Sequence, residues 1–303
     1  MTKQKRWEEY SEQEILQANI EKYNNEAIVK FYEDFEEPKH LYLEYRVMFN
    51  SLVKMLNMRS NEPISAVDMC GGAGKAAFAL YECSPTSMIS LVDVSDKMLE
   101  IAQKRAEREN IKNIIPIQAD AFSFLEQEGE YDLIIFSSAI HHFKDPVNLI
   151  NLASQRLSEH GLILTIADPN TITKSKRYKF LEFMVSSREA KKNKLKSCFN
   201  FRKNKDIAAS VDADFDLAEY QTYTGIDDIA LRNRLMEVGL NPFIHLRYPA
   251  GEPYMTKIMP YLGLYWAFSM IICKNVINEY EVHKDSIRKE LVENMPFKFK
   301  FMM

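Results

Sequence analysis

The sequence has few cysteines, and none of them are closely spaced. Its 303 residues include Cys70, Cys83, Cys198 and Cys273, without a C-x-x-C pair. This spacing argues against a zinc knuckle and against a small disulfide framework. We therefore expect the chain to work in a reducing, cytoplasmic setting.

Long apolar runs and a strong excess of one charge are also missing. The longest apolar stretch, YLGLYWAFSMIIC (261–273), is shorter than the ~20 residues that a transmembrane helix needs. No apolar core follows the charged N-terminal stretch, so we expect neither a secretory signal nor membrane insertion. The net charge of −4 favours no class of partner, and the sequence predicts no oligomeric state.

The composition predicts a globular protein with a sizeable core. Hydrophobic residues make up 46% of the chain and charged residues 27%, whereas glycine (9) and proline (11) are scarce. These values exclude a disordered or fibrous chain. The length fits about two domains, or one α/β domain with insertions.

The first 60 residues predict a helical segment. Ser11 and Glu14 have the spacing of a capping box, and apolar residues at helical intervals continue to residue 57, interrupted at Pro38. The part after Pro38 places five apolar residues on one face: Leu41, Tyr45, Met48, Leu52 and Leu56.

From Ile64 onward, short apolar runs alternate with helical stretches. We expect strands at 64–69, 88–94, 114–120, 131–138, 161–168, 241–249 and 265–274. Near-continuous apolar strands separated by helices predict a parallel sheet that is covered on both faces. The expected fold is α/β, a Rossmann-like seven-stranded sheet with N-terminal helices and a helical insertion (lid) after strand five. The expected units are a helical segment at 1–60, an α/β domain at 61–169 and 225–280, a lid at 170–224 and a tail at 281–303.

The predicted lid is rich in basic residues. Residues 171–206 contain twelve Lys or Arg against three acids, with Tyr178, Phe180 and Phe199 interleaved. Such a stretch can neutralise phosphates and stack on bases, so nucleic acid is one candidate partner. The negative net charge and the lack of an RNA-binding module argue against it. A solvated helix face, a membrane surface or an anionic small molecule are the alternatives.

The glycine cluster in AVDMCGGAGKAAF (66–78) indicates a cofactor loop, for which two ligands compete. Gly72, Gly74 and Ala77 satisfy the dinucleotide pattern G-x-G-x-x-A, with Asp93 downstream to hold a ribose. Asp68 argues against NAD, because a fixed carboxylate before the loop would repel a pyrophosphate. S-adenosylmethionine carries a sulfonium and an ammonium and no phosphate, so the acid favours that cofactor.

Five motifs in order then resemble the class I S-adenosylmethionine-dependent methyltransferases. Asp68, Gly72 and Gly74 match the family's acid-x-G-x-G-x-G, although Cys70 replaces its first glycine. The further matches are LVDVSDKMLEIAQ (91–103), IQADAFSF (117–124), YDLIIFSSAIHHFKD (131–145) and RLSEHGLILTIADP (156–169). We expect Gly71, rather than Cys70, to absorb the turn of the loop.

The resemblance implies a cofactor contact for each matched residue. Gly72 and Gly74 would lie against the methionine part, and Asp93 would hold the ribose hydroxyls. The remaining residues implied for this site are Val94 and Phe122 beside the adenine, Asp120 at its amino group, Ser137 after strand four, and Met98 and Ala121 within the same motifs. Independently of the resemblance, Arg46 could pair with the cofactor carboxylate.

His141 and His142 follow strand four, at the sheet edge where such folds bind ligands. One of them suits the role of a general base toward a hydroxyl acceptor, and the alternative is a packing or loop-bonding histidine. Because adjacent side chains point apart, we expect no two-histidine metal site.

The acceptor is expected to be a small organic molecule that is methylated at oxygen. Aromatic and apolar residues could line its pocket or form ordinary core, namely Tyr23, Phe31, Tyr32, Tyr42, Tyr178, Phe180 and Met184. An RNA or tRNA methyltransferase and a catalytically silent cofactor-binding partner subunit are the alternative functions.

Overall fold

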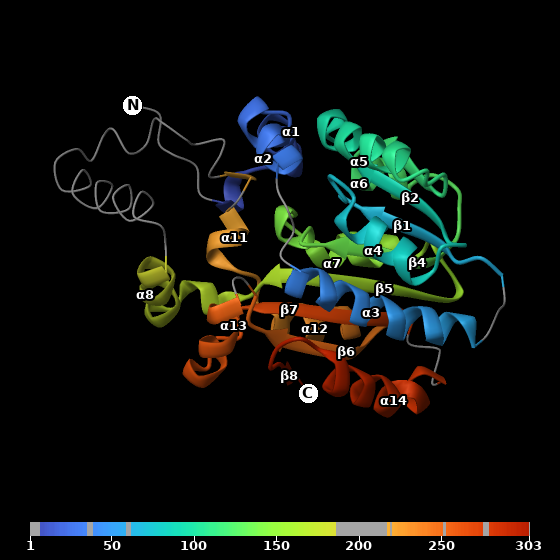
Figure 1. Ribbon diagram of the computed structural model, residues 1–303. Coiled ribbons are helices and arrows are strands. Elements are labelled where there is room, and N and C mark those ends of the chain that lie inside the picture. The colour runs from blue at the N-terminus through green and yellow to red at the C-terminus, as the bar shows by residue number, and fades with distance from the viewer. Residues whose placement is uncertain are drawn as a thin grey trace.

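The computed structural model of the protein describes residues 7–34, 39–58, 62–185, 217–218, 220–250, 253–274 and 279–302. Its body is one eight-stranded sheet with helices on both faces (Figure 1). The strands are β1 (Ser65–Met69), β2 (Met88–Asp93), β3 (Ile114–Gln118), β4 (Tyr131–Ser137), β5 (Leu157–Pro169), β6 (Leu240–Tyr248), β7 (Ala267–Lys274) and β8 (Lys300–Phe301).

The strands lie in the order β3-β2-β1-β4-β5-β7-β6-β8. The first five are mutually parallel, whereas β7 runs antiparallel to β5 and to β6, and β8 pairs antiparallel with β6. The chain moves outward from β1 to β3 and then crosses to β4 on the other side. Ligands of such sheets bind where the strand order reverses, at the carboxyl ends of the strands.

The helices cover both faces of the sheet and its carboxyl edge. Those of the N-terminal half are α1 (Glu12–Tyr23), α2 (Glu26–Asp34), α3 (Lys39–Asn57), α4 (Lys75–Cys83), α5 (Asp96–Arg108), α6 (Ala121–Leu125) and α7 (Pro146–Ser154), with short 3-10 turns η1 (Trp7–Glu9) and η2 (Ile140–His142). The later ones are η3 (Thr171–Lys174), α8 (Lys176–Val185), α11 (Tyr220–Thr224), α12 (Asp228–Glu237), α13 (Pro253–Ile258), η4 (Met259–Leu262) and α14 (Glu279–Asn294).

Two apolar cores sandwich the sheet. One contains residues of α3, α4, α5 and α14, and the other contains residues of α6, α7 and α12. Side chains alternate between the two along β4, so that Leu133 and Ile135 enter the first core and Ile134 and Phe136 the second. This two-sided burial explains why the strands read as unbroken apolar runs.

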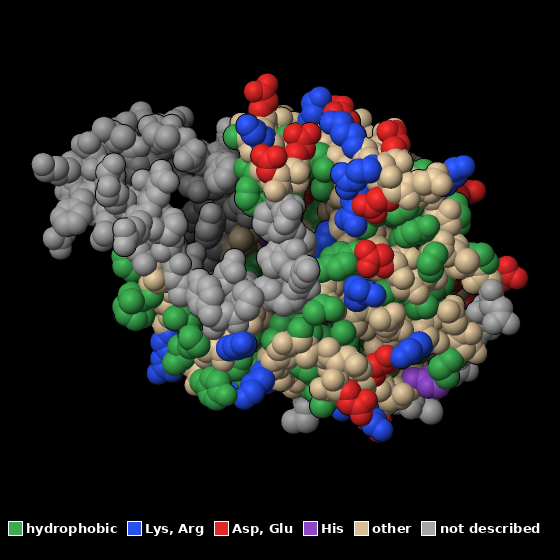
Figure 2. Space-filling view, in the orientation of Figure 1, with side chains coloured by type: hydrophobic (Ala, Val, Ile, Leu, Met, Phe, Trp, Pro, Cys, Tyr) green, Lys and Arg blue, Asp and Glu red, His purple; other side chains and the backbone are tan. Residues whose placement is uncertain are grey.

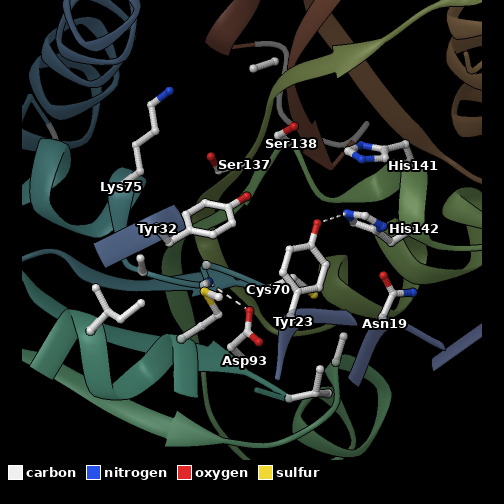
Figure 3. A pocket seen from close by; sticks show the side chains of 18 of the residues that line it. Asn19, Tyr23, Tyr32, Cys70, Lys75, Asp93, Ser137, Ser138, His141 and His142 are labelled. Atoms are coloured by element: carbon white, nitrogen blue, oxygen red, sulfur yellow. Dashed lines mark hydrogen bonds between the residues drawn. The ribbon is translucent and has the colours of Figure 1, made fainter. Parts of the chain in front are cut away.

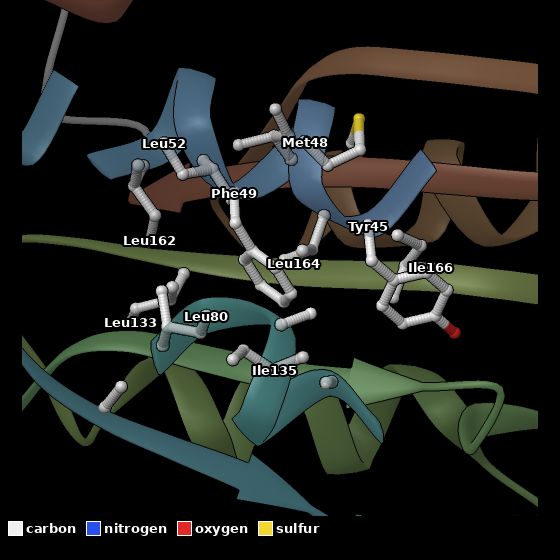
Figure 4. Packing of buried hydrophobic residues seen from close by; sticks show 14 of the residues in the cluster. Tyr45, Met48, Phe49, Leu52, Leu80, Leu133, Ile135, Leu162, Leu164 and Ile166 are labelled. Atoms are coloured by element: carbon white, nitrogen blue, oxygen red, sulfur yellow. The ribbon is translucent and has the colours of Figure 1, made fainter. Parts of the chain in front are cut away.

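Helix α3 is held on the sheet by the apolar face that its sequence predicts. Four residues of α3 are buried against Leu80 of α4 and against Leu162, Leu164 and Ile166 of β5, namely Tyr45, Met48, Phe49 and Leu52 (Figure 4). Each such side chain contributes about 1.5–3 kcal/mol through burial of apolar surface. The helical segment before the sheet is therefore part of the domain's core.

Most predicted elements are confirmed, with some corrections. The capping box is present, since Ser11 Oγ accepts the Glu14 N–H and Glu14 accepts the Ser11 N–H. The predicted helix is also interrupted near Asn24, before the break expected at Pro38, which lies outside the described residues. The strand count of seven is wrong by one, because the expected tail contributes most of α14 and the short strand β8.

The expected lid is described only at its two ends. Elements η3 and α8 follow β5, and α11 precedes α12, whereas residues 186–216 and most of the basic run lie outside the described residues. No helix in the described ranges combines the length and apolar character needed to cross a bilayer.

Candidate active site

The glycine loop after β1 contains three residues in the left-handed conformation. Cys70 has φ +55°, Gly72 +52° and Gly74 +83°, whereas Gly71 is not among the positive-φ residues. The expectation that Gly71 absorbs the turn is therefore wrong. A hypothetical Cβ on Gly71 would lie 2.6 Å from the Asp68 carboxylate and 2.4 Å from Leu91, so Gly71 is needed for close packing instead.

Asp68 lies beneath this loop and outside the residues that line the cavity. Its Oδ2 accepts the N–H of Ala77 in the first turn of α4 at 3.0 Å. Its Oδ1 is buried and accepts no hydrogen bond from the residues that the structure describes. Burial, partly offset by the Ala77 hydrogen bond, raises the pKa of Asp68 to about 7.

The strain at Cys70 leads to a stability prediction. Cys70→Val is expected to lower the free energy of unfolding by about 2 kcal/mol or more, because a β-branched residue is an outlier at positive φ. Cys70→Gly should change it by less than about 1 kcal/mol, since relief of the backbone offsets the greater freedom of the unfolded glycine. Urea unfolding followed by circular dichroism measures both, with Cys83→Val as the matched control. Equal stabilities of the valine and glycine variants would contradict a left-handed Cys70.

Asp93, at the end of β2, uses both carboxylate oxygens to organise its surroundings. Oδ2 accepts the N–H of Gly72 and Oδ1 accepts the N–H of Ser95, each at 2.8 Å. Asp93 lines the cavity although it is 8% exposed, and this burial raises its pKa. Val94 and Met98 lie beside it in the lining, as predicted.

The carboxyl ends of β3 and β4 supply the next group of predicted residues. Asp120 is the N-cap of α6, where its Oδ1 accepts the N–H groups of Phe122 and Ser123. Ala121 and Phe122 join it in the cavity lining. Ser137 also faces the cavity, and its hydroxyl lies 2.8 Å from that of Tyr45 on α3.

His141 and His142 both line the cavity, from the 3-10 turn η2 after β4 (Figure 3). Their ring centroids are 4.1 Å apart, so the expectation that the two side chains point apart is wrong. Among the described residues, no cluster of three His, Cys, Asp or Glu side chains could hold a metal ion. The pair therefore presents two imidazoles to one cavity.

Asp168 orients the first of these imidazoles. Nδ1 of His141 lies 2.8 Å from Oδ1 of Asp168 at the end of β5, and both side chains are buried. Burial raises the pKa of Asp168 to about 8, opposed by hydrogen bonds from the backbone N–H groups of 139–141 and by the charge of His142. When Asp168 is a carboxylate, Nδ1–H of His141 donates to it, and Nε2 keeps a lone pair.

A β-bulge at the end of β5 brings Asp168 into place. The pairing with β7 shifts between Thr165 and Asp168, and Ala167 has φ +66°. The bulge also directs the Ala167 N–H to the hydroxyl of Tyr248, at 2.9 Å. Bulges near active sites commonly re-aim a side chain in this way.

The second imidazole is tied to the N-terminal helices. The carbonyl of Ala218 can only accept, so Nδ1 of His142 donates to it at 2.9 Å. Nε2 of a neutral His142 therefore accepts from the Tyr23 hydroxyl, 3.3 Å away (Figure 3). The hydroxyl of Ser95, two residues after Asp93, in turn donates to the carbonyl of Tyr23 and to the side-chain oxygen of Asn24.

Most of these residues line one cavity of about 1470 Å³. Typical small-molecule sites measure roughly 300–1,000 Å³, so the cavity has room for a cofactor together with an acceptor. Of the predicted pocket residues, the structure brings four to this cavity, namely Tyr23, Phe31, Tyr32 and Tyr42. Tyr178, Phe180 and Met184 lie outside the lining.

Besides Asp68, two predicted cofactor residues lie outside the lining. Gly74 caps α4 instead of facing the cavity. Arg46 is half-exposed, and its guanidinium pairs with Glu82 at 3.7 Å, so the structure does not bring it to the site. Lys75, which the sequence reasoning missed, lines the cavity with its ammonium 4.2 Å from the centre of the Tyr45 ring.

The sequence reasoning also missed two acids, Asp168 and Glu44. Asp168 stands at a strand's carboxyl end, a position that could have marked it as a candidate. Glu44 is buried yet lines the cavity, and it interacts with the hydroxyl of Tyr248. Burial and the Glu44 carboxylate together raise the pKa of Tyr248. Its place on a helix face gave no signal in the sequence.

Comparisons with known proteins identify the family. The sequence model of the methyltransferase domain matches residues 60–218, more than half of the chain. The mitochondrial 2-methoxy-6-polyprenyl-1,4-benzoquinol methylase of Caenorhabditis elegans is 30% identical over 115 residues, 36% of this chain and 40% of that protein. A demethylmenaquinone methyltransferase of Leptospira interrogans is 24% identical over 153 residues, 50% of this chain and 61% of that protein. The matched regions thus span less than two thirds of these relatives.

Solved structures share the fold. The plantazolicin methyltransferase BpumL, in complex with a monoazolic desmethylPZN analog and SAH, aligns with a TM-score of 0.54 at 14% identity, over 87% of this chain and 96% of that chain. Magnesium protoporphyrin IX methyltransferase from Synechocystis PCC 6803, with bound SAH, gives a TM-score of 0.52 at 13% identity, over 86% and 99%.

The sheet order and the glycine loop at the strand switch point define a Rossmann-like methyltransferase fold. The chain belongs to the class I S-adenosylmethionine-dependent methyltransferases. This membership sets aside the dinucleotide alternative.

Proposed function

We propose that this chain is an enzyme that transfers the methyl group of S-adenosylmethionine to a small organic acceptor carrying an ionisable hydroxyl. The observation that carries this proposal is the buried His141–Asp168 pair: His141 lines the cavity, and its Nδ1 lies 2.8 Å from Oδ1 of Asp168 behind it. A buried histidine oriented by a carboxylate is suited to accept a proton at Nε2.

The residues of the cavity fit the cofactor. Asp93 would hold the ribose hydroxyls, Val94 and Phe122 would flank the adenine, and Asp120 would accept its amino group, all from positions in the lining. Asp68 lies beneath the loop and outside the lining, so it would support the loop rather than contact the cofactor.

Lys75 replaces Arg46 as the candidate partner of the cofactor carboxylate. Lys75→Met is expected to weaken the affinity for S-adenosylhomocysteine about tenfold, the scale of one charge-assisted hydrogen bond. Arg46→Met is the matched control and should leave the affinity unchanged, since Arg46 pairs with Glu82. Titration calorimetry measures both, and a loss confined to the Arg46 variant would reverse the assignment.

The cofactor supplies an activated methyl group, so the protein's task is to align the acceptor, exclude water and remove a proton. His141 would take the hydroxyl proton at Nε2 while Asp168 stabilises the resulting imidazolium. The acceptor oxygen forms the new bond to carbon as the carbon–sulfur bond breaks, which leaves S-adenosylhomocysteine. We propose oxygen as the methylated atom, as the histidine pair predicts.

The names of the relatives favour a second candidate, methylation at a ring carbon. Two ubiquinone/menaquinone biosynthesis C-methyltransferases are among them, 22% and 28% identical. Deprotonation of a phenolic hydroxyl also makes the adjacent ring carbon nucleophilic, so the same His141–Asp168 pair would serve either outcome.

Methyl transfer from labelled S-adenosylmethionine to naphthoquinols and to the small molecules of a cell extract tests the proposal. We expect S-adenosylhomocysteine to form together with a labelled product, and nuclear magnetic resonance distinguishes a methyl ether from a ring methyl. Tight binding of S-adenosylhomocysteine without product from any acceptor would instead support a catalytically silent partner subunit.

A further inference from the structure

Large hydrophobic side chains are exposed together beside the cavity. Phe180 and Met184 of α8 are 67% and 53% exposed, and Ile258, Tyr261 and Leu262 of α13 and η4 are 50%, 78% and 46% exposed. We call these five residues the α8–η4 patch. Figure 2 shows hydrophobic side chains gathered over α8 and α13, with Lys and Arg side chains among them. Isolated exposed apolar residues are ordinary, whereas a gathered set indicates an interaction surface.

The charges around the α8–η4 patch are mainly positive. Helices α8, α13 and η4 contain four Lys or Arg residues and one acid, Glu182. On α8, the exposed Lys176 precedes Phe180 and Met184 at successive intervals of four residues, so these three share one helix face. The patch therefore combines apolar side chains with cations on one surface.

Tyr261 is the most exposed aromatic residue of this surface, and a lysine accompanies it. The ammonium of Lys298 lies 3.2 Å from the Tyr261 hydroxyl and 4.5 Å from its ring centre. An exposed tyrosine with an adjacent lysine is typical of the zone between lipid headgroups and water, where the ring is buried and the polar ends stay hydrated.

The patch adjoins the wall of the cavity. Tyr178, on the inner side of α8, contacts Trp266 with the two ring centroids 5.8 Å apart. Trp266 and Pro169 line the cavity. The contact between Tyr178 and Trp266 thus connects α8 to the cavity wall.

We propose that the α8–η4 patch seats on an anionic lipid membrane and gives the cavity access to a lipid-soluble acceptor. Basic residues attract the enzyme to anionic headgroups, and the exposed aromatic and aliphatic side chains enter the headgroup–acyl boundary. The part that concerns the acceptor rests on the proposed function, whereas membrane binding does not depend on methyl transfer.

Co-sedimentation of the full chain with vesicles tests the proposal. We expect binding to vesicles of equal parts phosphatidylglycerol and phosphatidylcholine, and at least about tenfold weaker binding to phosphatidylcholine alone. Phe180→Ser/Tyr261→Ser should weaken binding to the anionic vesicles about tenfold or more. The matched control, Met88→Ser/Val292→Ser, removes two exposed hydrophobics outside the patch, which are 45% and 65% exposed, and should bind like the wild type within about twofold.

Two outcomes would overturn the proposal. One is equal vesicle binding by the patch variant and its control, with both folded by circular dichroism. The other is binding of a labelled single-stranded RNA that the patch variant loses in parallel, because this would mark the surface as a nucleic-acid site. A chain that binds vesicles but transfers no methyl group would contradict the proposed function and leave the membrane surface standing.

Discussion

His141→Ala is expected to lower kcat by about 10²–10⁴, the range over which a positioned general base contributes. The affinity for S-adenosylhomocysteine should stay within about threefold, because a base acts on the acceptor side. His283→Ala, on α14, is the matched histidine control and should retain full activity. Single-turnover methyl transfer separates the chemical step from product release.

The pH dependence of the methyl-transfer rate should also reflect the His141–Asp168 pair. The base requires Asp168 as a carboxylate, since a protonated Asp168 would donate to Nδ1 of His141 and move the ring proton to Nε2. Because burial raises the pKa of Asp168 to about 8, the rate should rise as the pH is raised through about 8. Asp168→Asn should be slow at every pH and lack this limb.

An unchanged rate of His141→Ala with a phenolic acceptor would contradict the assignment of His141 as the base. A rate that falls equally in His141→Ala and in His142→Ala would instead indicate that the two imidazoles act together. The ring separation of 4.1 Å makes this second outcome a direct test of their coupling.

Asp93→Asn is expected to weaken binding of S-adenosylhomocysteine by about 10- to 150-fold. The carboxylate accepts the N–H groups of Gly72 and Ser95 and would hold the ribose hydroxyls, and the loss of one hydrogen bond to a charged group costs about 1.5–3 kcal/mol. An asparagine keeps the shape but offers only one acceptor oxygen and brings two hydrogens against backbone donors.

Titration calorimetry provides the measurement, and Asp96→Asn is the control. Asp96 is an exposed acid at the start of α5, three residues from Asp93, and its loss should change the affinity by less than about twofold. Equal affinities of the two variants would show that Asp93 does not hold the cofactor.

The sheet and much of the cofactor side could be predicted from the sequence because their signals are local. Two-sided burial leaves apolar runs such as 131–138, and the acids at 93 and 120 lie at the end of a strand or two residues beyond it. The short strand β8 carries no such signal, since two residues cannot show a period.

What could not be predicted depends on distant contacts. The hydroxyl of Tyr23 meets His142 across 119 residues of sequence, and no local pattern encodes this distance. Cys70 adopts a conformation that local sterics assign to glycine, because the loop around it determines the turn. Lys75 and Arg46 are both cations near α4, and only their positions in three dimensions distinguish them.

The β5 bulge changes which face of the sheet the last side chains of that strand point to. Leu162, Leu164 and Ile166 all enter the core beneath α3 and α4, so simple alternation would send residue 168 to the same side. Asp168 instead bonds His141, whose neighbour Ile140 packs in the opposite core. One additional residue thus exchanges the two sides of the sheet just before the strand ends. A regular strand would have directed the Asp168 carboxylate into the apolar core beneath α3 and α4, whereas the bulge directs it to His141.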